Sequence, residues 1–415
     1  MLQEEQVSQQ RHTGVAQPGR GEAVAERVGI ELMAYKREEE AAGRWQDLER
    51  QLNNTGLTNS WTWIKTWLDI YGEVVEPTFA FGVQHGQVMG AALITKATHK
   101  MSGLPIPAVH LGTAGEPREE TTAVEYNQLL VAPEQLEGFA LALVEALKQR
   151  FRWSQFRLNG FMPEHAKALI RGGSKIDLQF QVKERESPAF DFQKAANEGH
   201  KEVVAALGSS TRYNIRRSLR LFESKFGAQQ IEWAETSEQA RDIVSELIEL
   251  HQKRWEQVKE PGAFQSERVK RYHNALIDAL KLWVGEKGAL KGSDLAGSRK
   301  HEQGSLLIFR LKYGETTVGC LFSFVDKHGR VMFYKCGLPL FDDNKLKPGL
   351  VTHAVCMEEC KRRGLRVYDF LAGDAIYKDQ LSNVDGKLIW ATAGRGPRAW
   401  VIDTAKQVRD MLAQR

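Results

Sequence analysis

The chain of 415 residues has no apolar run that approaches the roughly 20 residues needed to cross a bilayer. Its first 25 residues are rich in Gln, Glu, Arg and Gly, and they lack the apolar centre of a signal peptide. These absences predict a cytoplasmic protein that does not insert into membranes, with residues 1–25 as a disordered N-terminus.

Cysteine is scarce, and its placement argues against a metal site. The chain has four cysteines, Cys320, Cys336, Cys356 and Cys360, all in its last quarter. The last two share one face of a predicted helix, but no matching pair of His or Cys follows them. Buried free thiols in a reducing compartment account for this pattern, so we expect no metal.

Neither sign of charge is in large excess. The 57 Lys and Arg residues nearly balance the 53 Asp and Glu residues, which leaves a net charge of +4. A footprint for a polyanion would therefore have to be local. Residues 212–220 place several guanidinium groups on a predicted helix, which could bind nucleic acid or the phosphates of a carrier. A solvated helix face is the simpler interpretation.

The length suits two domains, and an internal repeat indicates where they lie. Residues 79–95 read as two apolar strands joined by a turn at His85 and Gly86. Residues 307–325 repeat this hairpin, with Gly314 and Gly319 in the corresponding places.

The same order of elements follows each hairpin. The first copy continues with a predicted helix over 138–151, a strand over 155–158 and a turn at 159–160. The second continues with a helix over 349–363, a strand over 365–371 and a turn at 372–373. The pattern predicts an α/β (α+β) chain of two related units. The polar stretch 183–188 suggests the boundary between domains over 26–185 and 186–415.

The second turn carries ionisable groups that the first lacks. Asp374, Tyr377 and Lys378 follow the strand that contains Asp369, whereas Asn159 stands in the first turn. Functional groups in α/β proteins gather where strands end, so we expect the second domain to carry the chemistry and the first to be structural or docking. A carboxylate would act as base, a tyrosine as acid and the lysine at an oxyanion. An ordinary strand end with surface charges is the alternative.

Two further segments could bind ligands. Lys345 and Lys347 precede the predicted helix of the second copy, where exposed amides suit a phosphate; a capping Asn344 beside two solvated lysines is the alternative. Arg254 and Trp255 lie on a predicted helix ahead of Phe264, and these three could line an acceptor site. A core tryptophan beside a surface arginine would explain them equally well.

In their order along the chain, these motifs resemble the CelD-like, cellulose-biosynthesis branch of the GNAT acyltransferase superfamily, which is related to the FemAB peptidyltransferases. The matching pieces are residues 59–72 and 126–133 in the first half and 251–255, 262–264, 319–320, 334, 348–349 and 368–378 in the second. The resemblance implies tandem GNAT-like domains, each a mixed, mostly antiparallel sheet flanked by helices.

The resemblance also implies a donor, acetyl-CoA or another acyl-CoA. Its phosphates would meet residues 342–349, and the implied cofactor-binding residues are Lys345, Lys347, Gly349, Leu350 and Lys378. The glycine signature that GNAT proteins usually carry at this place is absent, and Lys-Leu-Lys-Pro-Gly stands there instead. FemAB relatives take an aminoacyl group from charged transfer RNA, which is the alternative donor.

The sequence therefore predicts an acyl-CoA-dependent N- or O-acyltransferase, with acetyl as the expected acyl group. The acceptor would be a saccharide, a peptide or a cell-envelope or exopolysaccharide precursor. The candidate catalytic residues are Asp369, Asp374, Tyr334 and Tyr377, and the candidate acceptor contacts are Arg254, Trp255 and Phe264. The alternatives are a Fem-type peptidyltransferase that uses aminoacyl-tRNA and a noncatalytic GNAT scaffold.

Overall fold

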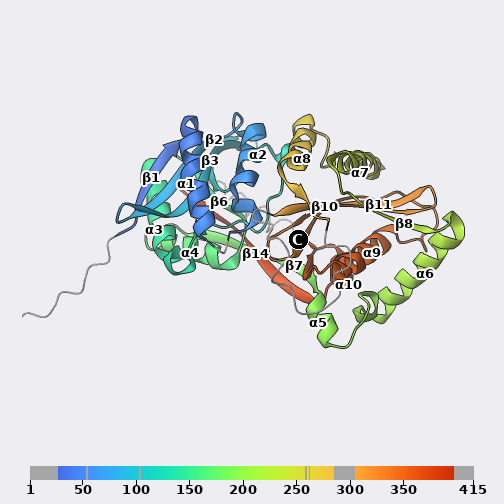
Figure 1. Ribbon diagram of the computed structural model, residues 1–415. Helices are drawn as coiled ribbons and strands as arrows, with labels where there is room; N and C mark the ends of the chain where they lie inside the picture. The colour runs from blue at the N-terminus through green and yellow to red at the C-terminus, as the bar shows by residue number, and fades with distance from the viewer. Residues whose placement is uncertain are drawn as a thin grey trace, which may run out of the picture.

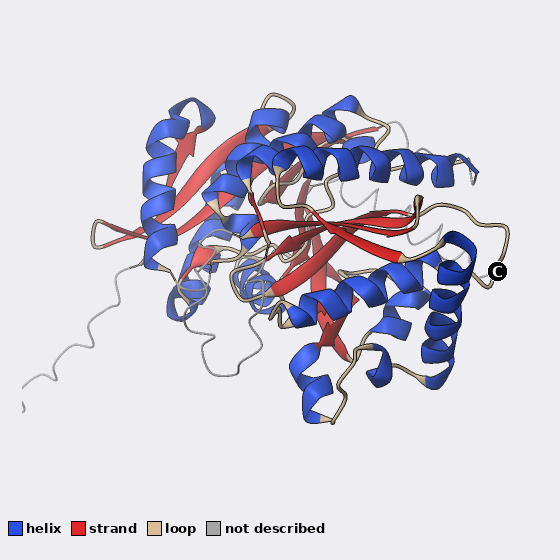
Figure 2. Cartoon of the chain, turned by 45° about the vertical axis from the view of Figure 1, so that its right-hand side comes forward, coloured by secondary structure: helices blue, strands red, loops and turns tan. Residues whose placement is uncertain are grey.

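The computed structural model describes residues 27–52, 55–101, 104–257, 259–260, 262–284 and 304–396. The predicted disordered segment 1–25 lies outside these residues. Strands run through the centre of the molecule and helices lie on both sides of them (Figures 1 and 2). This is the mixed α/β architecture that the sequence predicts.

The described residues form one 14-stranded sheet with the path β1-β2-β3-β4-β6-β14-β7-β13-β12-β11-β10-β8; β5 pairs with β3 and β9 with β10. Neighbours are antiparallel except β4 with β6, β12 with β13 and β9 with β10. The strands are β1 (Gly29–Ala34), β2 (Glu76–Gln84), β3 (Gln87–Met101), β4 (Leu104–Leu111), β5 (Leu130–Val131), β6 (Gln155–Phe161), β7 (Phe180–Asp191), β8 (Gln229–Trp233), β9 (Lys281–Leu282), β10 (Ser305–Tyr313), β11 (Thr316–Val325), β12 (Arg330–Gly337), β13 (Val367–Asp369) and β14 (Val384–Gly394).

Helices cover both faces of this sheet, and Figure 1 shows α7 and α8 on the opposite side of the second-half strands from α9 and α10. The helices are α1 (Glu38–Gln51), α2 (Trp61–Tyr71), α3 (Leu136–Arg150), α4 (Pro163–Ser174), α5 (Phe192–Asn197), α6 (Ser209–Phe226), α7 (Ser237–Gln257), α8 (Glu267–Ala279), α9 (Pro348–Arg362) and α10 (Ile376–Leu381). Among the described residues, none of them has the length and apolar character needed to cross a membrane.

Both predicted hairpins are present. β2 and β3 turn at His85 and Gly86, with φ angles of 51° and 74°, and β10 and β11 turn at Gly314, with a φ of 52°. These left-handed conformations match the right-handed twist of the flanking strands, and glycine adopts them without steric cost. Each hairpin is followed by a third strand, a helix and a parallel strand, so the repeat predicted from the sequence is confirmed.

Three local boundaries differ from the predictions. β6 continues through the predicted turn at 159–160 to Phe161, because Asn127 bridges to Phe161 and extends the pairing. β13 ends at Asp369, two residues early, because Leu371 has a φ of 59° that a strand does not allow. Tyr377 and Lys378 lie on the short helix α10 and not in a turn.

The two halves share strands. β14, which comes last along the described chain, lies between β6 and β7 and pairs with both of them. β7 in turn lies between β14 and β13. The polar stretch 183–188 is therefore the middle of a strand and not a linker. The division into domains over 26–185 and 186–415 stays a prediction, and any such domains exchange strands across their boundary.

The halves also share a hydrophobic core. One cluster of buried residues draws on α1, α2, β2 and β3 of the first half and on α7, α8, β10 and β11 of the second. Within it, the ring centroid of Trp63 lies 5.1 Å from that of Phe324 and 6.2 Å from that of Tyr272. Two other clusters lie on the opposite face: one is within the second half, and the other joins first-half residues to Ile389, Ala391 and Ala393 of β14. The halves thus share one large cluster on one face of the sheet, and on the other face β14 links the second half to the first.

Gly337 tests how closely α7 must approach β12. A Cβ atom at this position would lie 2.5 Å from the carbonyl oxygen of Leu247 on α7. We expect Gly337→Ala to lower the free energy of unfolding by about 1–3 kcal/mol, because the helix must move outward. In α1, Gly43→Ala meets no atom within 4 Å and should raise stability by about 0.5–1 kcal/mol. Urea unfolding of both variants measures these changes, and equal stabilities would contradict the close contact.

Candidate active site

Strands β12 and β13 separate after a short pairing. Only residues 330–332 of β12 pair with β13, while β12 continues to Gly337. Beyond this point, the side of β12 that faces β13 has no strand partner among the described residues. We call this opening, between residues 333–337 and 370–373, the second-half splay.

The equivalent opening in the first half is filled by the chain itself. There β4 pairs with residues 155–157 of β6, and Asn127 then occupies the space between the two strands. The side-chain amide of Asn127 donates to the carbonyl of Leu111 at 2.9 Å, and the backbone amide of Asn127 donates to the carbonyl of Gly160 at 2.9 Å. The first half therefore has no free backbone edge at this place.

The segment that fills the first splay continues across to the second half. Residues 116–126 are held there by the Tyr334 hydroxyl, which donates to the carbonyl of Thr122 at 2.8 Å. Glu120 accepts from Arg268 at 2.6 Å and from Ser266 at 2.9 Å. The backbone is left-handed at Ala123, so the segment adopts a conformation that only its surroundings can stabilise. We call residues 116–126 the bridging segment.

Asp369 is the anchor of the bridging segment. One of its oxygens accepts hydrogen bonds from the Tyr126 hydroxyl at 2.5 Å and from Arg330 at 2.6 Å. The other accepts from the Ser187 hydroxyl at 3.0 Å and from the amide of Leu371 at 2.8 Å. The carboxylate is fully buried and makes four hydrogen bonds. This environment favours a structural role over that of a general base.

Glu125 lies at the second-half splay. Its Oε2 atom accepts a hydrogen bond of 2.7 Å from the amide of Ala372, just after β13. Burial is the largest effect on this half-buried side chain, and it raises the pKa of Glu125 to about 7. The nearby Asp369 also raises the pKa, whereas the amide of Ala372, Lys378 and Arg185 lower it.

Two lysines also lie in the environment of Glu125. Lys378 is buried and donates to the carbonyls of Leu371 and Ala372 at 2.9 and 2.8 Å. Lys335 lies on the splayed part of β12, with its Nζ 4.9 Å from the ring centroid of Tyr334. Burial lowers the pKa of both lysines, and Glu125 partly offsets this for each. A carboxyl group that titrates near neutral pH thus faces two cations at the splay.

The other predicted catalytic residues differ in their exposure and in their contacts. Asp374 is exposed. Tyr377 is half-buried and stacks on His353 at 5.5 Å between ring centroids, and burial raises the pKa of its hydroxyl. Burial likewise raises the pKa of Tyr334, whose hydroxyl is already bonded to the bridging segment. Both tyrosines therefore keep their protons at neutral pH.

The predicted acceptor contacts separate into an exposed and a buried group. Trp255 is 39% exposed, and Arg254 is exposed beside it at the end of α7. Burial raises the pKa of Tyr377 on α10, and the charge of Arg254 partly offsets this effect. Phe264 has no exposed surface, so it cannot contact an acceptor directly as predicted. Its ring instead packs against His251 at 5.1 Å.

His251 itself is engaged on both ring nitrogens. Its Nδ1 donates to the carbonyl of Cys336 at 3.1 Å, and its Nε2 accepts from the amide of Ala263 at 3.3 Å. The direction of both bonds describes a neutral ring, and burial lowers the pKa of His251 in agreement. His251 therefore fixes the end of α7 and the 262–264 turn against β12.

The predicted phosphate-binding residues meet at the N-terminus of α9. This helix begins at Pro348 without a side-chain cap, so the capping Asn344 that the sequence allows does not occur. The amide of Lys347 donates to the hydroxyl of Ser218 on α6 at 2.9 Å, and Lys345 is exposed. The first turn, with Gly349 and Leu350, follows directly. The arrangement brings the basic helix α6 next to this end of α9.

The described residues contain no group of three His, Cys, Asp or Glu side chains placed to hold a metal ion. Cys356 and Cys360 lie with their sulfur atoms 4.0 Å apart in the core, and burial raises the pKa of the Cys360 thiol.

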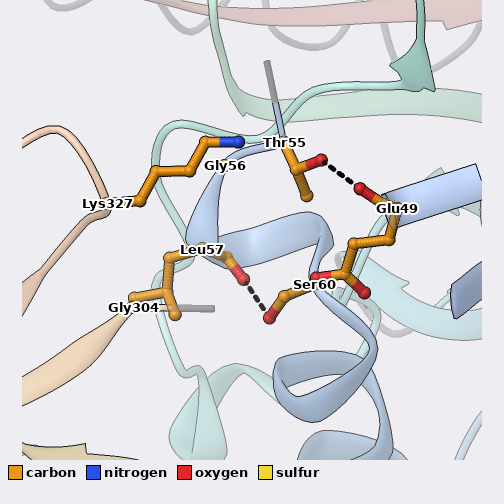
Figure 3. Close-up of a pocket in the computed structure, with 7 residues that line it drawn as sticks. All are labelled: Glu49, Thr55, Gly56, Leu57, Ser60, Gly304 and Lys327. Carbon is orange, nitrogen blue, oxygen red and sulfur yellow. Dashed lines mark hydrogen bonds between the residues drawn. The ribbon is translucent and has the colours of Figure 1, made fainter. Parts of the chain in front are cut away.

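A small hollow lies where α1 and the following turn meet the second half. Figure 3 shows its lining residues Glu49, Thr55, Gly56, Leu57, Ser60, Gly304 and Lys327. The space they enclose does not admit a water molecule. It is a packing contact between the halves and not a substrate site.

Residues 209–291 and 292–379 match the model of the acetyltransferase (GNAT) domain family. Among solved structures, FemX aligns with a TM-score of 0.51 and 11% identity, over 87% of this chain and 96% of FemX. A tandem GNAT protein from the clavulanic acid biosynthesis pathway aligns with a TM-score of 0.43 and 12% identity, over 89% of this chain and 99% of that protein. L-PGS from Bacillus licheniformis aligns with a TM-score of 0.44 and 12% identity, over 90% of this chain and 97% of L-PGS. The comparison with curated proteins finds no match.

The fold of the chain is thus similar to that of FemX. The match to the GNAT domain family lies within the second half, over residues 209–379.

Sequence reasoning missed Glu125 and Lys335. Glu125 lies in an irregular segment far from the second half in sequence, so no periodic pattern marks it. Lys335 follows Tyr334 in an otherwise apolar strand. A charged residue in such a strand is costly to bury, and that signal could have identified it.

Asp369 and Asp374 have opposite environments, which a pair of isosteric variants can test. We expect Asp369→Asn to lower the free energy of unfolding by about 3 kcal/mol, because it leaves the partly buried Arg330 without its counter-charge. Asp374→Asn changes an exposed group and should alter stability by less than about 0.5 kcal/mol. Chemical denaturation compares the two, and a stable Asp369→Asn protein would refute the anchoring role.

The raised pKa of Glu125 predicts a pH-dependent stability. The folded protein binds this proton more tightly than the unfolded chain, so the contribution is fully present at low pH and is lost as the pH rises through about 7. Relative to Glu125→Gln, the wild type should lose roughly 2–3 kcal/mol between pH 4.5 and 8. Thermal unfolding across this range measures the difference. Glu119→Gln, an exposed control in the bridging segment, should show no such slope.

Proposed function

We propose that the protein is an acyl-CoA-dependent acyltransferase, with acetyl-CoA as the expected donor and the second-half splay as its site. The observation that carries this proposal is the difference between the two copies of one unit. The first splay is occupied by Asn127, whereas in the second, among the described residues, 333–337 of β12 have no strand partner on the side that faces β13. An extended pantetheine chain could hydrogen-bond along this free edge as a strand would.

The donor phosphates would lie at the N-terminus of α9. Unbonded amides at a helix N-terminus, together with the helix dipole, favour an anion. Lys345 and Lys347 add positive charge directly before the helix, and Gly349 lies in its first turn. Leu350 continues the same turn. The splay and this helix terminus together would hold the two ends of an acyl-CoA.

The acceptor would enter from the side of α7 and α10. Arg254 and Trp255 are exposed at the end of α7, and the charge of Arg254 lowers the pKa of Tyr377 on α10 against the larger effect of burial. An aromatic surface beside a guanidinium suits a saccharide, a peptide or an envelope precursor that carries an anionic group. Cytoplasmic location and a small-molecule or polymer-precursor acceptor are part of this proposal.

The reaction would be a direct attack of the acceptor amine or hydroxyl on the thioester. The ammonium group of Lys378 donates two hydrogen bonds to backbone carbonyls, which fix its position. Its third N–H can donate to the oxyanion. Tyr377 has no hydrogen-bond partner for its hydroxyl among the described residues and stays protonated, so it suits the acid that protonates the leaving thiolate. Tyr334 instead fixes the bridging segment.

A second candidate function is peptidyl transfer from aminoacyl-tRNA. It is favoured by the basic helix α6, where Arg216 and Arg220 are exposed, and by the position of this helix beside the N-terminus of α9. A polyanion could reach both places at once. Saturable binding of charged transfer RNA that weakens in Arg216→Ala plus Arg220→Ala would support this candidate. If the protein binds neither acetyl-CoA nor charged transfer RNA, the result would favour a noncatalytic scaffold.

Calorimetric titration with acetyl-CoA tests the first proposal. We expect one saturable site in the wild type, and at least tenfold weaker binding in Lys345→Ala plus Lys347→Ala, because two charges near the phosphates are lost. Lys167→Ala plus Lys175→Ala removes one exposed lysine from α4 and another directly after it, and this variant serves as the charge-matched control. Absence of binding by the wild type, or equal binding by both double variants, would count against this site.

A further inference from the structure

We propose that the first half supplies the general base for the site of the second half, and that this base is the carboxyl group of Glu125. The inference rests on the proposed acyltransferase function and assigns one step of it. It changes the predicted division of labour, in which the first half is only structural or docking.

The position of Glu125 suits a base. Its Oε2 is fixed by the amide of Ala372 at 2.7 Å. Its Oε1 has no hydrogen-bond partner among the described residues. One oxygen thus orients the carboxyl group, and the other is available to a substrate. Ala372 belongs to the turn after β13, where the sequence predicts the chemistry.

The backbone on both sides of Glu125 is fixed in conformations that non-glycine residues rarely adopt. Ala123 and Tyr126 have φ angles of 47° and 58°, and across from them Leu371 has 59°. Such conformations persist where the surrounding contacts enforce them, and they gather at functional sites. Gly160 makes room for the segment, since a Cβ there would lie 3.0 Å from the Cα of Glu125.

The charges around Glu125 poise it for proton transfer. Lys378 on α10, Lys335 on β12 and Arg185 on β7 favour its ionised form, whereas Asp369 on β13 opposes it. Burial outweighs the cations, and the pKa of about 7 leaves both forms populated near neutral pH. A base of this strength can accept a proton in one step and release it in the next.

The competing carboxyl groups fit the role less well. Asp369 is fully buried, and its two oxygens already accept four hydrogen bonds. Asp374 is exposed, with no hydrogen-bond partner among the described residues to orient it. Of these three groups, Glu125 alone combines a fixed carboxyl with a free oxygen.

In the step itself, the acceptor heteroatom bonds to the carbonyl carbon of the thioester while its proton passes to Oε1 of Glu125. The tetrahedral oxyanion then collapses, the carbon–sulfur bond breaks, and the thiolate takes a proton from Tyr377. Glu125 passes its proton through solvent to Tyr377, which restores both groups. Acyl-CoA and acceptor are thus converted to acylated acceptor and free CoA, with no other reactant.

The test uses the full chain and acetyl-CoA as the donor, with water as the probe acceptor. Calorimetry measures binding, and release of free thiol measures turnover between pH 5 and 9. Glu125→Gln keeps an oxygen for the Ala372 amide but cannot take up a proton, so it should bind acetyl-CoA as the wild type does. Its thiol release should fall about 100-fold and lose the rise near pH 7. The Glu119→Gln control should match the wild type.

The outcomes separate the two proposals. Equal thiol release by the wild type and Glu125→Gln, including none from either while both bind acetyl-CoA, would overturn the assignment of Glu125 alone. Failure of the wild type to bind acetyl-CoA would overturn the proposed function, and this inference with it. If Glu125→Gln does not fold, Glu125→Asp replaces it. A shorter carboxyl should then slow thiol release while keeping a pH-dependent rise, and an unchanged rate would again reject the base.

Discussion

A single buried carboxylate, that of Asp369, keeps together the parts that the proposed chemistry needs. It lies on β13 and holds Arg330 of β12, Ser187 of β7 and Tyr126 of the bridging segment. A charge without these partners would be too costly to bury, so the four groups must assemble together. Because Glu125 precedes Tyr126 directly, the same ion pair fixes where the candidate base lies.

The two copies of the repeat differ because of one stretch of chain. Asn127 closes the first splay, and the bridging segment just before it reaches the second. The filled edge in the first half and the carboxyl group of Glu125 beside the second splay therefore both come from one continuous stretch of chain. This coupling gives the first half a reason to remain attached, beyond the core around Trp63 and the strands that the halves exchange.

The sequence predicted those features that depend on local rules. The hairpins follow from glycines at turns, and α9 follows from apolar periodicity and Pro348 at its start. The exchanged strands and the ligands of Asp369 depend on residues far apart in the chain, so no local pattern contains them. Phe264 shows the opposite failure, because an aromatic residue next to a glycine suits a core as well as a binding surface. Glu125 was missed because an irregular segment has no regular spacing of apolar residues that could reveal its position.

The place of β14 has a consequence for how the protein is made. This strand follows every other described element along the chain, yet it fills the gap between β6 and β7 in the first half of the sheet. During synthesis, the edges of β6 and β7 therefore stay without that partner until the ribosome has released residues 384–394. Unpaired edges attract other strands, so the nascent chain passes through a period in which it is prone to aggregate and suited to chaperone binding.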